Sequence, residues 1–184
     1  MPTYRRSRLG LARSFQITSL FLDFTALDNA ALAVQAHAGH SFHFWRDARS
    51  EAELREPARA ALARVGLAGR GDVPVSNLSH GEHRQLEIAM ALATRPRMLL
   101  LDEPMAGMGP DESARMVKML RELKRELTIL LIEHDMEAVF ALADRITVLV
   151  YGRIIASGTP EAIRSNAEVR QAYLGEQEQG VGHG

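Results

Sequence analysis

Two apolar stretches of this sequence end in side chains that could do chemistry. The first, "RMLLLDEP" (97–104), runs into Asp102 and Glu103. A carboxylate at the end of a buried strand is a hard oxygen ligand, and Mg²⁺ is commonly held by one or two such groups together with water and phosphate oxygens. Glu103 follows directly on the other side of the chain, where it could orient or deprotonate an attacking water. An ordinary acidic turn after a strand is the alternative interpretation.

The second stretch, "TILLIEHD" (128–135), ends in Glu133, His134 and Asp135. In an open α/β sheet the carboxyl ends of parallel strands face the ligand crevice. An imidazole there could hydrogen-bond a terminal phosphate or the water beside it. A structural or solvent-exposed histidine is the alternative for His134. A metal site at Glu133 and Asp135 is disfavoured, because no further ligand is spaced to complete it.

A third polar group begins a helix, at "LSHGEHRQLEIA" (78–89). Ser79 and Glu82 have the spacing of a capping box, in which each side chain bonds the other residue's amide. Gly81 in the first turn costs a helix about 1 kcal/mol relative to alanine, so a glycine here suggests that something approaches the backbone closely. The amides and dipole of a helix N-terminus suit a phosphate. The residues alone leave anion binding and plain capping equally open.

The elements that must position these groups alternate along the second half of the chain. Short apolar runs alternate with helical patterns from residue 97 onward, which indicates a parallel α/β sheet covered on both faces. Residues 25–66 are alanine-rich and predict helices. The specific expectations are strands near 98–101 and 129–132, helices near 111–126 and 135–143, a hairpin near 145–158, and helical faces at Leu54, Ala58, Leu62 and Val65 and at Leu86, Ala89, Met90 and Ala93. We expect one domain over 1–174, helical over about 20–95, and a disordered tail over 175–184.

Composition excludes several classes of protein. The chain has 184 residues, a net charge of −1 and no cysteine, so disulfides and thiolate metal sites are excluded and a nucleic-acid-binding module is disfavoured. No apolar run reaches the roughly 18 residues of a membrane span. The arginine-rich start would also fit a transit peptide, but it continues without a break into a motif described next.

The three stretches together resemble a known family. "LSHGE", "MLLLDEP" and "LLIEHD", in this order and spacing, are similar to the signature motif, Walker B motif and switch histidine of ABC-type ATPases. "GLARSFQ" (10–16) resembles the Q-loop, with Gln16 at its functional position. The segments "LEIAMALATRPRMLLLDEPMAGMGPDE" and "GRIIASGTPEAIRSNAEVRQAYLGE" are similar to ATP-binding subunits of branched-chain amino-acid importers. The resemblance implies a partial P-loop NTPase fold of the α/β class, a parallel sheet with a helical signature subdomain.

The resemblance also implies ligands and roles. The cofactors would be ATP and Mg²⁺, with Gln16 and Asp102 at the metal, Glu103 polarising the attacking water and His134 holding it. The implied nucleotide-contacting residues are Gln16, Leu78, Ser79, His80, Gly81, Glu82, Asp102, Gly109 and Asp111. In the family the signature helix binds the γ-phosphate held by the opposite subunit.

The implied partners are a second ABC ATPase subunit, identical or not, transmembrane permease subunits and, indirectly, a periplasmic solute-binding protein. The implied location is cytoplasmic and peripheral, on the inner face of the plasma membrane. The aromatic group 42–45 would dock the permease or belong to the helical core.

Three departures from the family pattern bear on function. His80 replaces the first glycine of the commoner signature, and Gly109 stands where the D-loop usually has Asn or Asp. The P-loop pattern G-x-x-x-x-G-K-[S/T] does not occur: the lysines are Lys118 and Lys124, and neither follows glycine. We therefore expect no ATPase activity from this chain alone.

Several interpretations of the missing P-loop remain. The chain would be part of a longer ATPase, a regulatory remnant that supplies only its signature face to a partner, a non-transport ABC ATPase, or a relic. We also expect the strand near 98–102 to lack a neighbour, which would make the isolated chain poorly soluble or cause it to dimerise through that edge.

Overall fold

The computed structural model describes residues 9–13, 20–38 and 52–172. It divides into two compact parts, Met1–His134 and Asp135–Gly184, and each is described by itself. The expected Q-loop residue Gln16, the aromatic group 42–45 and the tail 175–184 lie outside the described residues.

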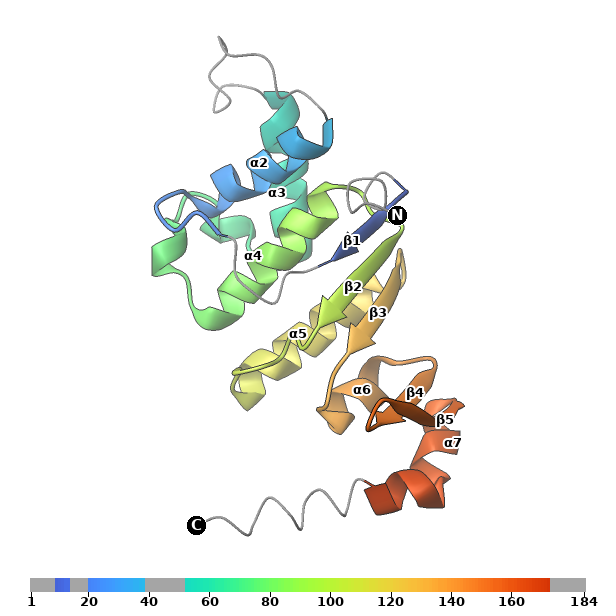
Figure 1. The fold of residues 1–184 in the computed structure, drawn as a ribbon. Coiled ribbons are helices and arrows are strands. Elements are labelled where there is room, and N and C mark those ends of the chain that lie inside the picture. The colour runs from blue at the N-terminus through green and yellow to red at the C-terminus, as the bar shows by residue number, and fades with distance from the viewer. Residues whose placement is uncertain (1–8, 14–19, 39–51, 173–184) are drawn as a thin grey trace. The chain divides into compact units, whose positions relative to one another are not determined.

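A three-stranded parallel sheet forms the centre of the first part (Figure 1). The strands are β1 (Leu11–Arg13), β2 (Met98–Asp102) and β3 (Thr128–Ile132), in the order β1-β2-β3. Asp102 lies opposite Ile132 in the register of β2 and β3. The prediction of parallel apolar strands is confirmed, and the carboxyl ends of β2 and β3 meet at one edge of the sheet.

The predicted open edge at residues 98–102 is wrong. β2 pairs with β1 on one side and with β3 on the other, because the short upstream strand β1, which is not predicted from the sequence, occupies the expected gap. Among the described residues, β1 and β3 are the two edge strands of this sheet. Leu130 is 49% exposed and Ile132 is 51% exposed, so the prediction of a sheet covered on both faces is also wrong at β3. Self-association of the isolated chain is accordingly expected at β3.

The helical region of the first part contains three packed helices. These are α2 (Ala26–Ala38), α3 (Ala52–Arg64) and α4 (His80–Ala93). Two short 3-10 turns, η2 (Ala68–Arg70) and η3 (Val75–Asn77), lie between α3 and α4. The predicted apolar face of α3 is confirmed, since Leu54, Ala58, Leu62 and Val65 are all buried. This packing holds α4 in place and so fixes the position of its N-terminus.

The buried face of α4 agrees with the prediction except at Met90. Leu86, Ala89 and Ala93 are buried, whereas Met90 is only partly so. Glu87 is buried as well and pairs with Arg84 at 3.0 Å. Burial raises the pKa of Glu87 despite the neighbouring guanidinium.

Helix α5 (Pro110–Leu123) follows the turn after β2. It buries four residues of its apolar face: Met116, Met119, Leu120 and Leu123. Gly109 is the N-cap of α5 and Pro110 is its first residue. Proline is favourable at this position because an amide N–H here would have no partner within the helix.

The second part consists of α6 (Met136–Leu142), the antiparallel hairpin β4 (Ile146–Val150) and β5 (Arg153–Gly158), and α7 (Pro160–Ser165). Its core contains Ile146, Ile163 and Val169. The predicted helix near 135–143 and the predicted hairpin are confirmed. None of the helices in the described ranges is long and apolar enough to cross a membrane.

Candidate functional site

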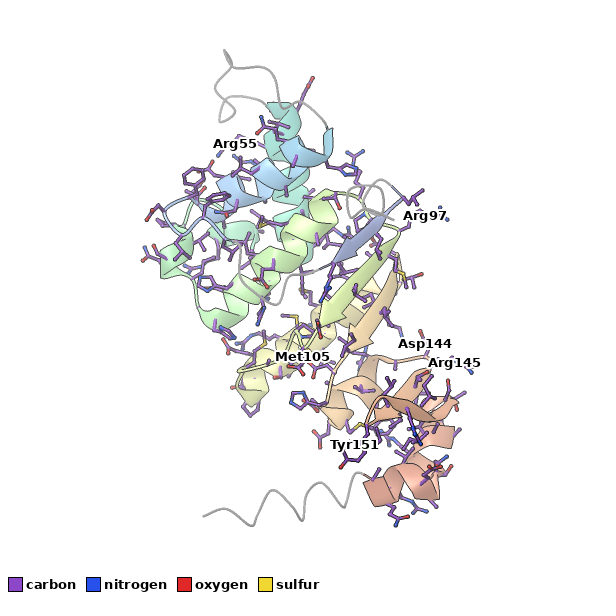
Figure 2. The ribbon with its side chains drawn as sticks, viewed as in Figure 1. Arg55, Arg97, Met105, Asp144, Arg145 and Tyr151 are labelled. Carbon is purple, nitrogen blue, oxygen red and sulfur yellow. The ribbon has the colours of Figure 1, made fainter. Side chains whose placement is uncertain are left out.

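The carboxyl ends of β2 and β3 bring the predicted chemical groups to one edge of the sheet. Asp102 and Glu103 follow β2, and Glu133 and His134 follow β3. Met105, labelled in Figure 2, lies in the turn after β2. The arrangement agrees with the expectation that parallel strands deliver their following residues to a common crevice.

Glu103 and His134 lie next to each other. The Oε1 atom of Glu103 is 3.4 Å from Nδ1 of His134, and the two side chains are 42% and 77% exposed. Glu103 also has φ of +47°, a left-handed conformation that is uncommon for a residue other than glycine. Its amide donates to the Ile132 carbonyl at 2.9 Å, which ties this strained residue to the end of β3. Strain of this kind tends to occur at functional sites.

Asp102 has a cationic neighbour that is not predicted from the sequence. Nη2 of Arg13, at the end of β1, lies 3.2 Å from Oδ2 of Asp102. The only signal for this contact in the sequence was the arginine-rich start, because pairing of β1 with β2 is a long-range feature. Asp102 therefore has a positive partner that would have to move or share the carboxylate if a metal bound.

A magnesium ion would find few ligands in this chain alone. Among the described residues no group of three or more His, Asp or Glu side chains is suited to hold a metal. Asp102 is a single hard carboxylate, 19% exposed. This fits Mg²⁺, which usually takes one or two carboxylates and completes its shell with water and phosphate oxygens. The site therefore suits a metal brought in with a phosphate ligand.

The N-terminus of α4 carries the predicted capping box. The amide of Glu82 donates to Oγ of Ser79 at 3.2 Å, and the amide of Ser79 donates to Oε2 of Glu82 at 2.8 Å. Arg70 also bonds the Glu82 carboxylate, at 2.8 Å. Although burial would raise the pKa of Glu82, the Ser79 amide and the Arg70 guanidinium outweigh it and lower that pKa. Glu82 thus already holds the helix start within this chain.

Gly81 does allow a close approach, but the approaching group belongs to the same chain. A Cβ atom at Gly81 would lie 2.9 Å from Oε1 of Glu112, in the first turn of α5. Ser79, Gly81, Glu82, Glu112 and Arg115 are among the residues that line a cavity of about 430 Å³ at this place. Glu112 was not anticipated from the sequence, since its contact with α4 depends on how the two helices meet.

His80 bonds the turn after β2. Its Nε2 atom lies 3.1 Å from the carbonyl oxygen of Ala106, and Gly107, with φ of +77°, lies against the same ring. Of the other predicted contact residues, Leu78 is buried at 7% exposure, and Gly109 and Asp111 are exposed at the start of α5. The signature stretch and the turn after β2 are therefore joined through His80.

Family models match two regions of the chain. Residues 2–106 match the model described as ABC transporter. The chain belongs to the ABC transporter family. Residues 153–179 also match the model described as branched-chain amino acid ATP-binding cassette transporter.

Curated ABC transporter relatives match along almost the whole chain. It is 40% identical to the high-affinity branched-chain amino acid transport ATP-binding protein BraF of Pseudomonas aeruginosa, over 96% of this chain and 72% of that protein. It is 39% identical, with the same coverage, to LivG of Escherichia coli, which has the same description. A probable branched-chain amino acid transport ATP-binding protein of Archaeoglobus fulgidus is 34% identical, over 96% of this chain and 70% of that protein.

Solved ABC transporter structures share the fold. The crystal structure of the ADP conformation of an ATP-binding cassette matches with a TM-score of 0.79 and 28% identity, over 95% of this chain and 72% of that one. A nucleotide-free cassette matches with a TM-score of 0.77 and 27% identity, over 94% and 72% of the two chains. The predicted α/β fold of an ABC ATPase is confirmed.

Proposed function

We propose that this chain is the ATP-binding, ATP-hydrolysing part of an ABC importer for branched-chain amino acids. The observation that carries the proposal is the Glu103–His134 pair, 3.4 Å apart at the shared edge of β2 and β3. The names of the relatives are the support for branched-chain amino acids as the transported solutes. The residues of this chain would not choose the solute, since that choice would reside in other subunits.

The proposed roles follow from chemistry and position. Asp102 would hold Mg²⁺, which when bound neutralises charge that develops on the phosphates. Glu103 would accept or orient a proton of the attacking water, and His134 would keep that water against the terminal phosphate. Arg13, paired with Asp102 at 3.2 Å, would orient the carboxylate. Gln16 would sense the metal and the water from the segment after β1.

The N-terminus of α4 is proposed to serve the nucleotide of a second ABC subunit. Ser79, Gly81 and the helix dipole would face that subunit's γ-phosphate. Glu82 contributes by keeping the cap formed, since its carboxylate is engaged by Ser79 and Arg70. Gly109 and Asp111, exposed at the start of α5, would contact the second subunit.

A permease surface is proposed at the segment before α2. Phe21, Leu22 and Phe24 are 56%, 52% and 40% exposed, and the rings of Phe21 and Phe24 are 5.4 Å apart. Adjacent exposed apolar side chains favour a protein contact. Such a contact would keep the chain on the inner face of the plasma membrane, where the permease would link it to a periplasmic solute-binding protein.

The 184 residues by themselves are proposed to be inactive, because they contain no glycine-lysine loop to grip the phosphates. A second candidate function follows from the same sequence and from the complete cap at α4. In that function the chain would offer only its signature face to a complete partner ATPase.

Hydrolysis by variant assemblies separates the two functions. The protein would be expressed from its own locus with the upstream DNA retained, together with its permease subunits, and ATP hydrolysis measured. For a catalytic subunit, Glu103→Gln lowers kcat by about 100-fold or more, while the matched surface change Glu126→Gln leaves kcat unchanged. For a signature-only subunit, Gly81→Arg abolishes hydrolysis and Glu103→Gln does not. Full ATPase activity in both Glu103→Gln and Gly81→Arg contradicts both functions.

A further inference from the structure

Glu133 is a buried carboxylate between the two catalytic loops. It follows β3 directly, and its side chain is 1% exposed. Its Oε1 atom accepts from the amide of Met105 at 3.1 Å, and its Oε2 atom accepts from the amide of His134 at 3.1 Å. One side chain thus bonds the turn after β2 and the loop after β3 at once.

Each of the two amides belongs to a loop that carries a candidate catalytic residue. Met105 is two residues beyond Glu103, in a turn where the amide of Ala106 also donates to the Glu103 carbonyl at 3.1 Å. The other amide is that of His134 itself. At the start of the turn, the amide of Glu103 donates to the Ile132 carbonyl at 2.9 Å. The left-handed conformation of Glu103 is therefore held from both directions.

A buried carboxylate needs donors to offset the loss of its hydration. If this position served packing alone, an apolar side chain would avoid that cost. A carboxyl group that accepts from two amides at once restricts the positions of both amides. The amides of Met105 and His134 lie in the two loops that carry the side chains the proposed reaction needs in contact.

We infer that Glu133 is a positioning residue that sets the Glu103–His134 contact by joining the turn after β2 to the loop after β3. The inference deepens the proposed function and depends on it for its catalytic meaning. The structural junction itself depends only on the contacts of Glu133, and it can be measured without nucleotide.

Residue-resolved amide exchange on the 184-residue chain tests the junction. In Glu133→Ala, the amides of Met105 and His134 should exchange at least about tenfold faster than in the native chain. In Glu133→Gln, which keeps the shape but offers one acceptor oxygen, one of the two amides should lose protection. The matched change Glu122→Gln, at an exposed carboxylate of α5, should leave both amides unchanged.

Two exchange results would overturn the inference. One is native exchange at both amides in Glu133→Gln and Glu133→Ala. The other is equal acceleration of every amide in β2 and β3, which would show general loosening of the fold. If Glu133→Ala does not fold, Glu133→Gln alone decides.

Kinetics of the assembly expressed from its own locus provide the second readout. Glu133→Gln should lower kcat about tenfold or more with KM within about twofold, because it misaligns reacting groups without removing a binding contact. Native kcat in Glu133→Gln overturns the inference. If the unsubstituted assembly does not hydrolyse ATP, the proposed function fails, and amide exchange still decides whether Glu133 forms the junction.

Discussion

The edge of β2 and β3 and the N-terminus of α4 satisfy their polar groups in different ways. At the sheet edge, Glu103 and His134 face each other, remain partly exposed, and include a residue with positive φ. At the helix start, Ser79 and Glu82 bond each other's amides. The first region keeps reactive groups available at some conformational cost, whereas the second is already a finished local structure. Substitutions should therefore change stability in opposite directions in the two regions.

The largest stability effect is expected from removing the cap. Ser79→Ala leaves the Glu82 amide without its acceptor and should lower the free energy of unfolding by about 1 kcal/mol. Urea denaturation measures the change. Ser76→Ala, at an exposed serine just ahead of the helix, is the control and should change stability by less than about 0.5 kcal/mol. Equal losses in both variants would show that the capping box contributes nothing at this site.

A smaller and pH-dependent effect is expected at Glu82. Its pKa in the folded chain is lowered from the ordinary value of 4.5, so the ionised carboxylate stabilises the fold above that pH and the contribution disappears as pH falls through the lowered value. Glu82→Gln should thus be less stable than the native chain by about 0.5 kcal/mol at pH 7, since the partners are partly exposed. Unfolding from pH 7 to pH 3 should show the difference shrinking. A difference that grows toward acid pH would refute the lowered pKa.

The smallest effect, with the opposite sign, is expected at the sheet edge. Glu103→Gly removes the side chain that makes a φ of +47° unfavourable, so stability should stay constant or rise by about 0.5 kcal/mol. In α3, where the backbone is helical, Glu56→Gly should instead lose about 1 kcal/mol. Thermal unfolding of the two variants gives the comparison. A clear loss in Glu103→Gly would mean that the edge is built for stability, as the cap is.

The sequence could predict local contacts and the ends of strands, but not the contacts between distant segments. Ser79 and Glu82 are three residues apart, so local spacing was enough to predict their bonds. The positions of Asp102 and His134 were also predictable, because each follows an apolar strand. The contacts of Arg13 with Asp102, Glu112 with Gly81 and His80 with Ala106 join distant segments. The residues next to Arg13, Glu112 and His80 in the sequence do not indicate these contacts.

The errors at the strands have a similar cause. The runs "MLLLD" and "TILLI" look equally apolar, yet Leu99 and Leu101 of β2 are fully buried while Leu130 of β3 is half exposed. Burial here depends on the place of the strand in the sheet. That place is fixed by pairing with Leu11–Arg13, a segment too short to predict as a strand from periodicity.

A double-mutant cycle on the sheet edge tests the central claim most directly. ATP hydrolysis would be measured for the assembly expressed from its own locus and for Glu103→Gln, His134→Ala and the double variant. If the two side chains act as one unit at a shared edge, each single change lowers kcat by about 100-fold or more. The kcat of the double variant is then within about threefold of that of the less active single variant. Losses that multiply in the double variant, or hydrolysis that persists in Glu103→Gln, would contradict the account.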